Sequence, residues 1–166
     1  MDFPPRTREQ ETGLTAEELA LVDQPLFDLV PKKWYDRASE WEEVKALQKK
    51  TGACILIYFK DPTNSDQKGM CNWFEGEAGS YNRWRKAMAY FIKFRIQLPG
   101  NTETRALAEE FRFKSTPAWF VLRPDGKFPK RLPVFTYPAG NPKPVRQDEL
   151  MESLTELCTP AYANLF

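Results

Sequence analysis

The residue types in the chain leave a thiol as the main candidate for reactive chemistry. The 166 residues include three cysteines and no histidine. The lack of histidine excludes Ser-His-Asp and Cys-His catalysis and zinc sites built on histidine. Cys54, Cys71 and Cys158 are odd in number and far apart, which fits neither a disulfide framework nor a four-ligand zinc site. We therefore expect no metal site and no bound cofactor.

Cys71 is the thiol whose sequence surroundings favour reactivity. It follows a polar, turn-rich loop over residues 60–69, and Cys71-Asn72-Trp73-Phe74 predicts the start of a helix. At a helix N-terminus, free backbone N–H groups and the positive end of the dipole stabilise a thiolate. A thiolate can attack a disulfide to form a mixed disulfide, but release of the partner needs a second thiol. Phe74 cannot supply one.

The other two cysteines are expected to be structural. Cys54 begins a predicted strand and Cys71 follows its end, so about five strand residues at roughly 3.3 Å each separate them. This separation exceeds the roughly 7 Å Cα limit for a disulfide. Nothing in the sequence places Cys158, on a predicted terminal helix, near Cys71. We expect Cys54 in the core and Cys158 partly buried.

Alternating helices and strands must position these residues. The spacing of capping boxes predicts helices from Thr15 and from Ser39, and Gly52 is placed to end the second. Strands are predicted at residues 53–59, 91–98, 118–122 and 131–136, and further helices near 71–88, 102–111 and 148–158. The order predicts an α/β chain with a mixed four-stranded sheet and helices on both faces.

Four features of this order resemble the thioredoxin superfamily. They are the helix with Trp41 before a buried strand, a cysteine soon after that strand, Thr116-Pro117 before the next core strand, and a Pro124-Asp125-Gly126 hairpin followed by a closing helix. The resemblance covers about residues 35–158 and implies a thioredoxin-like fold with a cis-proline at Pro117. Cys71-Asn72-Trp73-Phe74 is similar to a degenerate Cys-x-x-Cys motif of the bacterial thioredoxin-like branch.

The chain departs from this family at two positions. Phe74 stands in place of the second cysteine, and Tyr58 stands where many members have a buried acid that assists proton transfer. The resemblance with these departures implies a protein-binding or accessory module that has lost dithiol activity. Its expected contact residues for an extended segment of a partner protein are Met70, Asn72, Trp73, Phe74, Ser115, Thr116 and Pro117.

A monothiol oxidoreductase is the alternative function. Cys71 would then attack the substrate, and glutathione or a partner thiol would resolve the mixed disulfide. Phe74 beside Cys71 would desolvate the thiolate and oppose this activity. The sequence therefore favours binding over catalysis.

Charge and hydropathy limit the remaining partners and the compartment. The net charge of +1 argues against nucleic acid, and no apolar run is long enough for a membrane span. We expect an acidic arm with a short helix over residues 1–34, the thioredoxin-like domain over 35–158 and a tail over 159–166. The start of the chain lacks a signal peptide, which favours the cytoplasm, whereas prior removal of a signal would fit the periplasm.

Overall fold

A mixed sheet forms the centre of the fold in the computed structural model, which describes residues 3–166. Its five strands lie in the order β1-β3-β2-β4-β5, with β1, β2 and β3 parallel and β4 and β5 antiparallel to their neighbours. A separate two-stranded sheet pairs β6 with β7. The strands are β1 (Trp34–Tyr35), β2 (Ile55–Lys60), β3 (Ile92–Gln97), β4 (Ala118–Leu122), β5 (Lys130–Arg131), β6 (Phe135–Thr136) and β7 (Lys143–Pro144).

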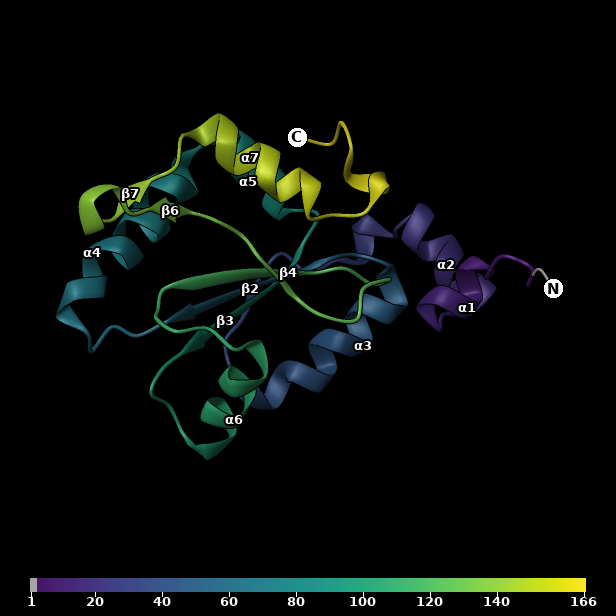
Figure 1. Cartoon of the computed structure of the whole chain (residues 1–166), viewed down its shortest axis with the longest axis horizontal. Coiled ribbons are helices and arrows are strands. Elements are labelled where there is room, and N and C mark those ends of the chain that lie inside the picture. Colours follow the sequence, from purple (N-terminus) through teal and green to yellow (C-terminus); the bar gives the residue numbers. More distant parts are fainter. Residues whose placement is uncertain (1–2) are drawn as a thin grey trace.

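Helices cover both faces of the five-stranded sheet. Figure 1 shows α3 and α6 on one side of the sheet and α4, α5 and α7 on the other, with α1 and α2 at one end. The α-helices are α1 (Arg8–Thr12), α2 (Ala16–Asp23), α3 (Trp41–Thr51), α4 (Ser65–Trp73), α5 (Asn82–Met88), α6 (Thr102–Phe111) and α7 (Gln147–Glu156). A π-helical turn, η3 (Phe74–Ala78), follows α4, and a 3-10 turn, η5 (Pro160–Tyr162), follows α7.

This arrangement confirms the predicted thioredoxin-like fold, with one more strand than expected. The extra strand β1 has only two residues, which is too short for an alternating pattern to reveal. The strand predicted at 131–136 is split into β5 and β6, and Pro133 lies between them. Proline cannot donate a hydrogen bond to a strand ladder, which accounts for the break.

The alternation of side chains along β2 divides the core between the two sheet faces. Ile55, Ile57 and Phe59 pack toward one face, together with residues of α3, β3 and α6. Leu56 and Tyr58 pack toward the other, with residues of α4, η3, α5 and α7. Because both faces are covered, β2 is apolar along nearly its whole length, as the sequence predicted.

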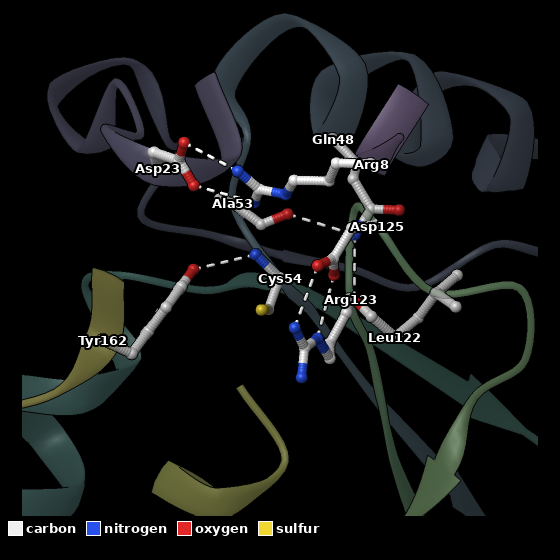
Figure 2. Close-up of polar contacts among 9 residues, drawn as sticks. All are labelled: Arg8, Asp23, Gln48, Ala53, Cys54, Leu122, Arg123, Asp125 and Tyr162. Atoms are coloured by element: carbon white, nitrogen blue, oxygen red, sulfur yellow. Dashed lines mark hydrogen bonds and ion pairs between the residues drawn. The ribbon is translucent and has the colours of Figure 1, made fainter. Parts of the chain in front are cut away.

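Polar contacts at the start of β2 join segments that are far apart in sequence (Figure 2). Gln48 Nε2 donates to the carbonyl oxygens of Ala53 at 3.1 Å and Leu122 at 2.8 Å. The backbone N–H of Cys54 donates to the hydroxyl of Tyr162 at 2.8 Å. The segment predicted as a tail thus contributes Tyr162, which is fully buried, to the core.

The N-terminal arm also packs on this end of the molecule. The capping box predicted at Thr15 is present at the start of α2. Gly52 ends α3 at φ 75°, and a Cβ there would collide with the backbone of Leu21. Glycine is therefore required both for the left-handed turn and for the close approach of α2. Within residues 3–166, no helix is long and apolar enough to cross a membrane.

Candidate functional site

Helix α4 begins earlier than the sequence predicted, so Cys71 is not at its N-terminus. Its N-cap is Asn64, whose side-chain oxygen accepts a hydrogen bond from the Asp66 N–H at 3.0 Å. Cys71 lies near the C-terminal end of α4, so the expectation that it starts a helix is wrong. Asparagine is a strong N-cap and an acid in the first turn suits the helix dipole, so the helix begins inside the apparent loop.

The first turn of α4 lies beside the Thr116-Pro117 segment. The peptide bond between these two residues is cis. The Thr116 hydroxyl donates to the side-chain oxygen of Gln67, one turn into α4. The α4 residue that contacts Thr116 is therefore Gln67, and the segment from Asn64 to Gln67 contains no thiol.

The backbone just before Pro117 lacks backbone partners in the described part of the chain. Pairing of β4 with β2 starts at Ala118, opposite Phe59. Among residues 3–166, neither Ser115 nor Thr116 makes a backbone–backbone hydrogen bond within the chain. An extended segment of another chain could therefore pair there.

Cys71 is buried one helical turn after Gln67. Its residue is 2% exposed and lies against Tyr58 on β2. Burial, with a further contribution from the Cys71 thiol, raises the pKa of Tyr58, so the hydroxyl stays protonated. That hydroxyl has no hydrogen-bond partner among residues 3–166. Tyr58 is thus an aromatic core residue and cannot replace a carboxylate in proton transfer.

The aromatic residues after Cys71 face the core. The Phe74 ring lies 4.8 Å from the rings of both Tyr58 and Trp119, measured between centroids, and Phe74 is 3% exposed. Trp73 is half-buried and packs on Tyr81 and Phe135. Phe74, which we expected on a contact surface, is instead buried in the first turn of η3.

The predicted contact residues therefore divide between surface and core. Asn72 and Ser115 are exposed, Met70 and Trp73 are half-buried, and Cys71, Phe74, Thr116 and Pro117 are buried. The Sδ atom of Met70 lies 3.9 Å from the hydroxyl of Tyr137. Sequence reasoning missed Asn64, Gln67 and Tyr137. The Asn64-Ser65-Asp66 cap signal could have located the first two.

The remaining two cysteines lie together at the opposite end of β2. The Cys54 and Cys158 side chains lie close together, and the Cys158 thiol donates to the Leu154 carbonyl at 2.9 Å. The contact with Cys54 and burial both raise the pKa of the Cys158 thiol. The sequence predicted both residues as packed, but their proximity depends on the docking of α7 and was not foreseen.

Burial predicts slow alkylation of every cysteine in the native protein. We expect iodoacetamide at neutral pH to modify Cys71, Cys54 and Cys158 about tenfold or more slowly than after unfolding in urea, because reaction requires local opening. Peptide mass spectrometry over a time course measures the three rates separately. Rapid native modification of Cys71 would contradict its position in the core.

Among known proteins, the chain is similar only to solved structures. No family model and no curated protein matches the chain. It is similar to thioredoxin f of spinach chloroplast at 17% identity and a TM-score of 0.47, over 77% of this chain and 96% of that one. It is also similar to the oxidised C-terminal domain of Neisseria meningitidis DsbD at 19% identity and a TM-score of 0.46, over 75% and 99% of the two chains. A Thermus thermophilus thioredoxin is 22% identical at a TM-score of 0.43, over 75% and 83%.

Proposed function

We propose that this protein is a non-catalytic binding module of thioredoxin-like fold that takes an extended segment of a partner protein. The contact surface would be the backbone of Ser115 and Thr116 together with the first turn of α4, from Asn64 to Gln67. The observation that carries the proposal is that, among residues 3–166, Ser115 and Thr116 make no backbone–backbone hydrogen bond, and the helix residue that contacts Thr116 is a glutamine.

Unpaired backbone groups at an ordered edge favour β-strand addition. A partner strand would supply the hydrogen bonds that Ser115 and Thr116 do not make internally. Gln67 and Asn64 would supply polar contacts from the helix, and Tyr137, which is 52% exposed, an apolar contact beside Met70. This proposal keeps the expected groove at Thr116 but replaces the residues around Cys71 with the start of α4.

The monothiol alternative has lost its two physical requirements. A nucleophilic cysteine needs exposure and a setting that stabilises the thiolate. Cys71 is 2% exposed and lies inside a helix that continues from α4 into η3, away from the N-terminal turn whose free N–H groups would stabilise a thiolate. No observation favours catalysis at Cys71, with glutathione or with any other resolving thiol.

Affinity capture from a cell lysate tests binding against covalent trapping. We expect the wild type and Cys71→Ser to capture the same partners, with or without a reducing agent. Gln67→Arg puts a bulky cation beside Thr116 and should reduce capture about tenfold, in the range of a binding hot spot. Gln10→Arg is the matched control, because it makes the same change on α1 at the far end of the molecule (Figure 1).

Two results would overturn the proposal. Adducts that a reductant releases from the wild type, and that Cys71→Ser does not form, would establish a monothiol mechanism. Equal capture by Gln67→Arg and Gln10→Arg would move the contact surface away from Thr116.

A further inference from the structure

A cavity of about 460 Å³ lies on the sheet face beneath the turn between α4 and α5. Its volume falls within the range of small-molecule sites. It shares no residue with the proposed surface at Gln67 and Thr116, so it concerns a separate activity. Strands β1, β2 and β3 form its floor, and η3 and α5 form its walls.

Strand pairing places aromatic and cationic side chains side by side in this cavity. Trp34 on β1 is in register with Lys93 on β3, and Tyr58 on β2 is in register with Arg95. Trp84 on α5 completes the apolar wall. The result is a surface for a flat apolar group with two cations next to it.

Lys93 is the unusual member of this set. It is 5% exposed, and its ammonium donates one hydrogen bond, to the carbonyl of Met88 at 2.9 Å. Among residues 3–166, no carboxylate lies within ion-pair distance of Lys93 or Arg95. The acid in the cavity lining, Glu75, pairs with Lys60 at 2.7 Å.

A buried lysine without a counter-ion is costly for a fold. Burial lowers the pKa of Lys93, which measures how poorly its charge is compensated. An ammonium has three donors, so hydrogen-bonding capacity remains after the contact with Met88. A ligand carboxylate would supply both the missing charge and an acceptor. The cavity is also lined by Lys32 and Arg85, which strengthen the preference for an anion.

We propose that this cavity binds a small aromatic monocarboxylate. The carboxylate would contact Lys93 and Arg95, and the ring would lie against Trp34 and Trp84. The aromatic walls argue for an apolar body on the ligand, because an inorganic anion would leave them without a partner. The lack of a protein carboxylate at Lys93 argues for the negative group.

Calorimetric titration with 2-naphthoate tests this proposal, and 2-naphthamide serves as its uncharged analogue. We expect naphthoate to bind at least about tenfold more tightly than naphthamide, which corresponds to roughly 1.4 kcal/mol. Lys93→Met keeps the apolar stem and removes the charge, so it should weaken naphthoate binding by a similar factor and leave naphthamide unchanged. Lys86→Met is the matched control, because Lys86 is an exposed lysine on α5 outside the cavity lining.

Arg95→Gln, at a half-buried position, provides a second test should Lys93→Met not fold. It should also weaken naphthoate selectively, and circular dichroism reports whether each variant is native. Equal affinity for naphthoate and naphthamide, no binding of either probe, or equal effects of the Lys93 and Lys86 substitutions would overturn the proposal.

Discussion

Cysteines in place of Asn64 and Gln67 together are expected to give this protein disulfide reductase activity. The two positions are three residues apart at the start of α4, and Gln67 contacts Thr116. A thiol at position 64 would lie at a helix N-terminus, which lowers its pKa below about 8.5 and favours attack on a disulfide. The thiol at position 67 would then release the substrate and leave a disulfide between the two new cysteines.

Insulin reduction by dithiothreitol measures this activity. The wild type should not exceed the rate with dithiothreitol alone, and Asn64→Cys/Gln67→Cys should raise it about tenfold or more. Loss of the Asn64 cap will cost about 1 kcal/mol of stability, so each variant is first checked for native structure. Dithiothreitol reduces the new disulfide in each cycle, which balances the reaction.

A second cysteine pair separates helix position from simple spacing. Asn72→Cys/Glu75→Cys has the same spacing at two exposed positions, but it lies where α4 passes into η3. It should remain inactive because neither the helix N-terminus nor Thr116 is nearby. Similar activity of the two pairs would show that the start of α4 does not favour dithiol chemistry, and activity in the wild type would contradict its proposed non-catalytic role.

The order of elements could be predicted because local patterns specify it. The apolar run of β2, the capping box at Thr15, the Gly52 cap and the turn before β5 are all local features, and each is found in the structure. Strand β1 could not be predicted, because two residues are too few to show the alternation of apolar and polar side chains that marks a strand. The length of α4 was hidden by Gly69 and by a polar composition typical of loops.

The start of this helix was mispredicted because a chemically prominent residue was taken as its marker. We predicted the helix to start at Cys71 because its thiol is reactive. The residue that determines where α4 begins is Asn64, which has no reactive group. Contacts such as Gln67 with Thr116, or Cys54 with Cys158, join residues far apart in the chain. Such contacts depend on how helices dock on the sheet, which residue types and spacing do not encode locally.

Loss of one hydroxyl at Tyr162 is expected to be the most destabilising conservative change in the C-terminal segment. This hydroxyl accepts from the Cys54 N–H at 2.8 Å and donates to the Tyr90 carbonyl at 2.6 Å. Tyr162→Phe keeps the ring contact with Phe91 but leaves the buried N–H of Cys54 without a partner. Unsatisfied buried groups cost about 1–3 kcal/mol each, so we expect a loss of about 3 kcal/mol.

Thermal and urea unfolding measure this loss, with Tyr137→Phe as the matched control. Three kcal/mol corresponds to a fall in Tm of roughly 10 °C for a chain of this size. Tyr137 is 52% exposed, so removing its hydroxyl should change stability by less than about 0.5 kcal/mol. An unchanged urea m-value would show that the effect comes from the native contact. If both variants unfold alike, then residues 159–166 do not dock on the start of β2, and the link from the C-terminal segment to Cys54 is wrong.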